Sequence, residues 1–165
     1  MGLNTSFLAE LKQESANTRK MLERVPANNP SWKPHEKSMT LGRLASHVAE
    51  LPMWVVSAVE KDELDFAKGE YTPFLAETNK ELLKTFADSI SKSIEALKKA
   101  TDENLMGNWK LRSGDQVYFE MPRVAVIRAM VLSHLIHHRG QLSVYLRLQE
   151  VPLPSIYGPT ADESM

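Results

Sequence analysis

Histidine offers the clearest chemistry in this 165-residue chain, because two of its five histidines have the spacing of metal ligands on one helix. His134 and His138 are four residues apart, so their side chains would lie about 5–6 Å from each other on a helical face. Two such imidazoles can converge on a divalent metal ion, or each can bond a carbonyl or a water in a helical core. The chain contains no cysteine, which excludes thiolate metal sites and catalysis by a protein thiol.

A third histidine lies on the inward face of an earlier helical segment. On a helical wheel of about 100° per residue, His47 shares a side with apolar neighbours, and His134 and His138 lie within an apolar stripe of their own segment. By itself, His47 would be interpreted as a boundary histidine in contact with water. Together the three predict one divalent metal centre, formed by His47, His134 and His138, with at least one open coordination position. Imidazole alone does not select the metal, so zinc, nickel, iron and manganese are all candidates.

Four residues near these histidines are candidates for contacts with a substrate or a ligand, each with a structural alternative. Glu50 is a candidate catalytic base beside metal-bound water, or a solvated carboxylate at the helix margin. Arg139 is a candidate catalytic residue that would hold an anionic substrate, although a salt bridge between helices is favoured. Trp54 shares the face of His47 and would line a pocket, or pack in the core. Gln141 would bond a ligand histidine from behind, or cap the edge of the core.

Four segments carry the apolar periodicity of helices and must position these residues. They span residues 5–25, 40–61, 78–100 and 122–150, and the loops between them are rich in proline, asparagine and glycine. Pro52 lies within the second segment, where it removes a backbone hydrogen bond and predicts a kink. Residues 107–120 instead alternate polar and apolar side chains around a Ser-Gly-Asp turn, which predicts a small hairpin or irregular insertion. These elements predict a single all-α domain over residues 1–165, a four-helix bundle with long crossover connections.

The composition excludes several classes of protein. Lys and Arg number 20 against 21 Asp and Glu, and this near-neutral charge argues against a nucleic-acid-binding protein. The longest strongly apolar stretch, residues 51–59, is far shorter than the roughly 20 residues of a membrane span. Residues 1–10 lack the pattern of a signal peptide. We therefore expect a cytoplasmic protein that acts on a small-molecule substrate, without nucleic acid or membrane. A homodimer is compatible with a small helical domain, and the sequence does not locate its interface.

Three stretches of the sequence carry a joint pattern. The first, residues 34–50, contains His47; the second, SHLIHHRGQ at residues 133–141, contains His134 and His138; the third is PLPSIYGP with Ala-Asp-Glu at residues 152–163. In this order and spacing they resemble the DinB (damage-inducible) family, within the DinB/YfiT-like superfamily of metalloenzymes. The likeness extends over nearly the whole chain, and the joint pattern is far more specific than any single histidine.

The resemblance implies a four-helix bundle whose three-histidine metal centre maps onto His47, His134 and His138, while His137 maps onto a position that is not a ligand. Members of the superfamily include thiol-dependent S-transferases and isomerases that use low-molecular-weight thiols such as bacillithiol or mycothiol. We therefore expect a metal-dependent enzyme in which the divalent ion activates a thiol or water for transfer to, or hydrolysis of, a small molecule. The alternative is a non-catalytic, stress-related, dimeric metal-binding protein whose ion only ties helices together.

Overall fold

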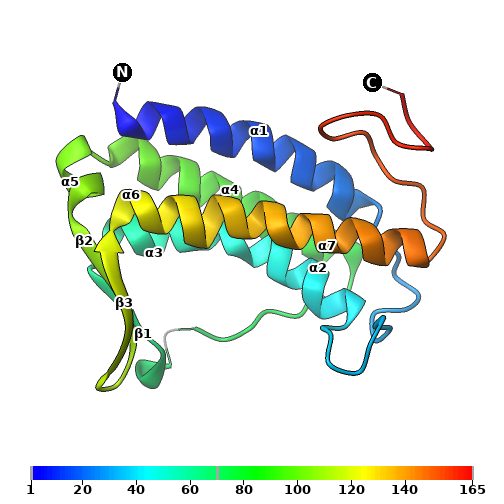
Figure 1. Cartoon of the computed structure of the whole chain (residues 1–165), viewed down its shortest axis with the longest axis horizontal. Coiled ribbons are helices and arrows are strands. Elements are labelled where there is room, and N and C mark those ends of the chain that lie inside the picture. The colour runs from blue at the N-terminus through cyan, green and yellow to red at the C-terminus, as the bar shows by residue number, and fades with distance from the viewer. Residues whose placement is uncertain (1, 70, 165) are drawn as a thin grey trace.

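The computed structural model describes residues 2–69 and 71–164, and its long helices lie side by side along one direction (Figure 1). Two of these long helices are interrupted. Residues 41–60 carry His47, and residues 123–148 carry His134 and His138. Helix α4 packs against α1 and against α2 and α3, while α7 packs against α1 and α2, so the helices enclose a common interior. The helical elements are α1 (Leu3–Glu23), α2 (Leu41–Glu50), the 3₁₀ turn η1 (Leu51–Met53), α3 (Trp54–Glu60), the 3₁₀ turn η2 (Phe66–Lys68), α4 (Asn79–Lys99), α5 (Asp102–Met106), α6 (Arg123–Val126), the π-helical turn η3 (Ile127–Ser133) and α7 (His134–Leu148).

The interruption predicted at Pro52 is confirmed. The run that begins at Leu41 changes at Leu51 from α-helix to a 3₁₀ turn, which contains Pro52, and continues as α3. Proline has no backbone N–H, so Pro52 cannot make the α-helical hydrogen bond at this position, and the chain forms a tighter 3₁₀ turn there. The backbone N–H of Arg43 donates to Thr40 Oγ1 at 3.2 Å, which caps the start of α2. The 3₁₀ turn begins at Leu51, directly after α2, the helix that carries His47.

The prediction of an all-α fold is wrong, because the chain also forms a three-stranded mixed sheet. Strand β1 (Glu63–Asp65) pairs in parallel with β2 (Asn108–Ser113), which pairs antiparallel with β3 (Gln116–Pro122). The hairpin of β2 and β3 occupies the stretch where the sequence predicted one. Strand β1 has only three residues, too few to show a period of two, and its partner lies more than forty residues later. Pairing over such a distance leaves no local signal in the sequence.

The hairpin turn has the local chemistry of a tight reversal. Gly114 has φ of 55°, a left-handed conformation that glycine adopts without steric cost. On the strands, Lys110 and Glu120 are cross-strand partners and form an ion pair of 3.3 Å. Trp109 lies beneath the sheet, only 1% exposed, and its Nε1 donates to the carbonyl of Ser57 at 3.2 Å. The sheet is thus anchored to α3 at one end of the helical layers.

The buried side chains form two clusters, one toward each end of the helices. The cluster near the sheet includes Val55 and Val131, and the cluster at the far end includes Val48 and Leu135. His134 lies between Val131 and Leu135 in the chain, so the candidate metal ligands lie where the two clusters meet. Among the described residues, none of the helices combines the length and the apolar character that a bilayer crossing requires.

Asp65 fastens β1 to the hairpin and provides a test of this unexpected strand. Its Oδ1 accepts hydrogen bonds from the backbone N–H groups of Gly114 and Ala67, both at 3.0 Å, and Arg112 lies 3.2 Å from Oδ2. The bond from Gly114 is the largest cause that lowers the pKa of Asp65 below its ordinary value of 3.8; burial opposes it, and Ala67, Arg112 and Lys68 add to the lowering.

A carboxyl group whose pKa is lower in the folded state stabilises the fold above its unfolded-state pKa, and that contribution disappears as the pH falls through the folded-state value. We therefore expect the thermal midpoint of the wild type to fall more steeply below about pH 4 than that of Asp65→Asn. Circular dichroism melting curves at stepped pH measure both. Parallel pH profiles for the two proteins would contradict the placement of Asp65.

Candidate metal centre

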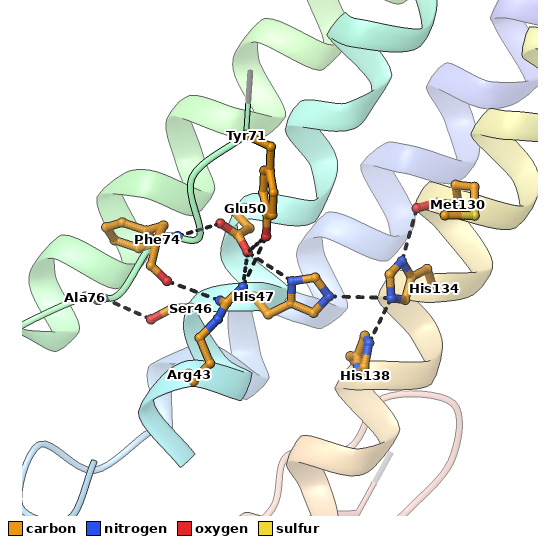
Figure 2. A network of polar contacts seen from close by, with 10 residues as sticks. All are labelled: Arg43, Ser46, His47, Glu50, Tyr71, Phe74, Ala76, Met130, His134 and His138. Carbon is orange, nitrogen blue, oxygen red and sulfur yellow. Dashed lines mark hydrogen bonds and ion pairs between the residues drawn. The ribbon is translucent and has the colours of Figure 1, made fainter. Parts of the chain in front are cut away.

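Three imidazoles from two helices converge on one point (Figure 2). Their candidate ligand atoms all lie within 4.8 Å of one another. His134 Nε2 is central, 3.5 Å from His47 Nε2 and 2.8 Å from His138 Nε2. His47 belongs to α2 and is buried, whereas His134 and His138 occupy the first turns of α7 and are only partly buried. The structure therefore brings together the three histidines selected from the sequence, at a place that is only partly buried.

Each imidazole has an oxygen acceptor behind it. His47 Nδ1 lies 3.0 Å from Glu50 Oε1, His134 Nδ1 lies 3.3 Å from the carbonyl of Met130, and His138 Nδ1 lies 2.7 Å from Gln141 Oε1. A carbonyl or carboxylate oxygen can only accept, so the Nδ1 atom of each ring carries the hydrogen. The Nε2 atoms are then left with free lone pairs, and these are the atoms that face one another.

The π-helical turn η3 makes the Met130 carbonyl available to His134. The backbone N–H of His134 donates to the carbonyl of Val131, three residues earlier, instead of to Met130. In an uninterrupted α-helix the N–H of His134 would occupy the Met130 carbonyl. Such π-turns occur frequently at functional sites. Here the turn supplies the acceptor that orients a candidate ligand.

The donor set fits a divalent cation. Burial lowers the pKa of His134, and burial, which outweighs the hydrogen bond to Gln141, lowers that of His138 to about 4, so both rings are neutral near pH 7, as metal ligands must be. Two unprotonated nitrogens at 2.8 Å repel each other unless a positive charge lies between them. Nitrogens held about 2.05 Å from one ion are separated by about 2.9 Å at a right angle and about 3.3 Å at the tetrahedral angle, close to the separations of His134 Nε2 from His138 Nε2 and from His47 Nε2.

Glu50 is the centre of a polar network behind His47 (Figure 2). Its Oε1 accepts from His47 Nδ1 at 3.0 Å, from Arg43 Nη2 at 2.7 Å and from Tyr71 Oη at 2.8 Å. Its Oε2 accepts from the backbone N–H of Phe74 at 2.9 Å. Burial raises the pKa of Glu50, but these hydrogen bonds together outweigh burial and lower it. Both oxygens of this carboxylate are therefore engaged in holding neighbours.

The same network fastens the segment of residues 71–76 onto α2. Arg43 Nη1 donates to the carbonyl of Phe74 at 3.1 Å, and the backbone N–H of Ala76 donates to Ser46 Oγ at 2.9 Å. Burial and the bond to Glu50 raise the pKa of Tyr71 to about 12, so its hydroxyl keeps its proton and donates. The loop that follows the sheet strand β1 is thus tied to the helix that bears His47.

A cavity of about 360 Å³ lies beside this network. Glu50, Trp54 and Tyr71 contribute to its wall, so Trp54 is placed where the sequence analysis expected a pocket-lining residue. Trp54 makes an edge contact with the ring of Tyr71, with centroids 5.8 Å apart. Glu50 connects the cavity to the histidine cluster, because it lines the cavity and bonds His47 Nδ1.

Arg139 lies away from the imidazoles, in a buried network with α1. Only 2% exposed, it pairs with Glu14 Oε2 at 2.7 Å and donates to Thr18 Oγ1 at 3.0 Å. It also donates to the hydroxyl of Tyr157, which in turn donates to Glu14 Oε2 at 2.6 Å. The described partners of Arg139 therefore come from α1 and the C-terminal segment, and this is the interhelical salt bridge that the sequence analysis favoured.

The remaining histidines stand apart from the cluster. His35 is exposed in the loop before α2, and His137 is exposed on α7, although its ring contacts that of His138 with centroids 4.9 Å apart. Sequence reasoning missed two members of the network around Glu50. Arg43 had a usable signal, since residues 43, 47 and 50 share one helical face. Tyr71 had none, because it lies in a loop without periodicity.

Gln141 provides a direct test of the hydrogen bonds behind the imidazoles. We expect Gln141→Ala to weaken zinc binding by about 10- to 100-fold, the usual effect of removing a partner of a metal-ligating histidine. Gln13→Ala, at an exposed site on α1, is the matched control and should leave the affinity unchanged. Competition with a chromophoric chelator measures both affinities. Equal zinc affinities for Gln141→Ala and the wild type would contradict an orienting bond to His138.

Comparisons with known proteins agree with this architecture. The model of the DinB family matches residues 1–165. The chain is 24% identical to the uncharacterized protein YrdA of Bacillus subtilis (strain 168) over 165 residues, covering 95% of this chain and 89% of that protein. A DinB-like protein of Bacillus cereus has a similar structure, with TM-score 0.70, 24% identity and coverage of 92% of this chain and 95% of that chain. The mycothiol-dependent maleylpyruvate isomerase is more distant, with TM-score 0.50, 12% identity and coverage of 87% of this chain and 59% of that chain. These structural likenesses show the fold alone.

Proposed function

The chain belongs to the DinB family, and from that premise we propose that it is a metal-dependent enzyme. In this proposal His47, His134 and His138 hold one divalent ion, and the reaction transfers a thiol to a small molecule or hydrolyses it. The observation that carries the proposal is the convergence of three Nε2 atoms within 4.8 Å, each on a ring whose Nδ1 faces an oxygen acceptor. Three neutral ligands leave coordination positions for a reactant.

The residues of the chain have separate tasks in this proposal. A divalent ion held by three imidazoles would supply Lewis acidity, which lowers the pKa of a coordinated thiol or water. Glu50 orients His47, the Met130 carbonyl orients His134, and Gln141 orients His138. Because all four hydrogen bonds to Glu50 come from groups that hold it in place, we assign it an orienting task in preference to proton transfer.

Transfer of an external thiol to a small-molecule substrate is the favoured reaction. The chain has no cysteine, so a thiol nucleophile has to come from a small molecule. The structural neighbour described as mycothiol-dependent supports a low-molecular-weight thiol as the cosubstrate. Water is the competing nucleophile, in which case the enzyme is a metallohydrolase. A thiol requirement distinguishes the two reactions.

The experiment that tests the proposal measures turnover while the bound metal and the added thiol are varied. Protein stripped with a chelator and reloaded with zinc, nickel, iron(II) or manganese is assayed with electrophilic substrates such as an aryl chloride or an epoxide, with and without bacillithiol or mycothiol. Thiol-dependent turnover that disappears on chelation supports a transferase, and thiol-independent turnover supports a hydrolase. A stoichiometrically metal-loaded protein without ligand binding or turnover in either condition would contradict the enzymatic proposal and leave a metal that only ties helices together.

A further inference from the structure

The cavity beside Glu50 has the size and lining of a small-molecule site. Its volume of about 360 Å³ falls within the usual range of ligand pockets, roughly 300–1,000 Å³. Met53, Trp54, Val56 and Leu64 give it an extensive apolar wall. It lies between α3 and residues 71–72, the beginning of the segment fastened to α2. A hydrophobic group of a ligand would gain stability here by leaving water.

The aromatic part of the wall is held in a fixed orientation. Trp54 makes edge contacts with Tyr71 at 5.8 Å and with Phe66 at 6.4 Å, and Phe66 lies 6.1 Å from Tyr71. Three rings that pack mutually restrict one another's rotation, and the hydroxyl of Tyr71 is further fixed by its bond to Glu50. A rigid aromatic wall favours a flat ring, which can pack edge-to-face or offset against it.

The charges around the cavity favour a neutral ligand. Two carboxylates, Glu50 and Glu60, line it together with one cation, Lys61, and the described lining residues include no arginine or histidine. Nearby Arg43 directs both of its terminal nitrogens to Glu50, Tyr71 and the Phe74 carbonyl. Among these described residues, a carboxylate or phosphate ligand would therefore find no arginine guanidinium with which to form a bidentate pair.

The cavity is connected to the histidine cluster through Glu50, on the Nδ1 side of His47. Glu50 lines the cavity and bonds His47 at 3.0 Å, and Tyr71 lines the cavity and donates to Glu50 at 2.8 Å. Figure 2 shows the Tyr71 hydroxyl and the His47 ring both directed at this carboxylate. We propose that the cavity is the substrate pocket of the metal centre and takes a neutral, ring-sized apolar group. This inference rests on the proposed function, because it assigns the pocket to that centre.

The test uses 2-naphthol as a neutral probe and 2-naphthoate as its anionic counterpart. Calorimetric titration is carried out on metal-free protein and on cobalt(II)-loaded protein. We expect 2-naphthol to bind at micromolar to low millimolar concentration and 2-naphthoate about 10-fold more weakly. Trp54→Leu should lower the affinity of the protein for 2-naphthol by at least about 10-fold. Trp32→Leu is the matched control, since Trp32 is also partly buried and makes an edge contact of 5.6 Å with Tyr145, outside the cavity.

The absorption of bound cobalt tests whether the cavity belongs to the metal centre. Saturation with 2-naphthol should also shift the visible absorption bands of bound cobalt, since the occupant touches the residues that orient His47. If 2-naphthol does not bind, or if Trp54→Leu and Trp32→Leu lose the same affinity for it, the cavity is not a ligand pocket. If 2-naphthol binds without shifting the cobalt absorption bands, the cavity is not the substrate pocket of the metal centre. Failure of the protein to bind any metal would instead refute the proposed function, and the titration on metal-free protein separates that result from failure of the pocket. Melting curves confirm that each variant is folded.

Discussion

His134→Ala is expected to reduce zinc affinity by at least about 100-fold, because it removes the nitrogen at the centre of the cluster. His134 Nε2 lies 3.5 Å from His47 Nε2 and 2.8 Å from His138 Nε2, so the remaining pair would lose the atom that both approach. Competition with a chromophoric chelator measures the affinity, and elemental analysis of purified protein measures the occupancy.

His137→Ala is the matched control for this change. His137 has the same side chain on the same helix and touches the ring of His138, but it lies outside the cluster. It should bind zinc as the wild type does. The ligand assignment would be refuted by equal zinc affinities in His134→Ala and His137→Ala, because the effect would then depend on the number of histidines and not on their position.

Arg139→Met is expected to destabilise the fold by about 3–5 kcal/mol, the typical cost of leaving one member of a buried ion pair alone. Arg139 is 2% exposed and Glu14 is 5% exposed, and methionine would leave the Glu14 carboxylate without its cation. The tail would lose a contact as well, since Tyr157 bonds both residues. Urea unfolding followed by circular dichroism measures the loss.

Two further variants separate the buried pair from an ordinary surface contact. Arg128→Met removes an ion pair with Glu10 that also reaches α1, but its side chain is 51% exposed, and we expect a loss of about 0–1 kcal/mol. Combining Arg139→Met with Glu14→Met should recover part of the stability, because the uncompensated carboxylate is gone. If Arg139→Met abolished turnover while the free energy of unfolding stayed unchanged, Arg139 would be a substrate-binding residue instead.

The three clustered histidines could be predicted from the sequence because their placement depends on local geometry. His134 and His138 share a helical face through their spacing of four residues, and His47 lies on the apolar side of its own helix. The helical spans and the break at Pro52 followed from periodicity and backbone chemistry in the same way. The family resemblance added the information that two distant helices face each other.

The features that sequence reasoning missed depend on contacts between distant segments. Strand β1 exists because β2 pairs with it, and Glu63 to Asp65 have no strand pattern of their own. The π-turn before His134 shows no distinct composition, yet in it the carbonyl of Met130 contacts the His134 ring and not the His134 backbone N–H. Glu14 is instructive because it lies between Leu11 and Thr18 on the buried stripe of α1, where a carboxylate requires a partner, and the sequence could not show that Arg139 supplies it.

Anomalous diffraction from crystals loaded with zinc, recorded on both sides of the zinc absorption edge, tests the metal centre most directly. A three-histidine centre should give one peak at about 2.0–2.1 Å from the Nε2 atoms of His47, His134 and His138, with each Nδ1 still directed at its oxygen acceptor. A peak bound to other residues, or three imidazoles that turn away from one another around no metal, would contradict it.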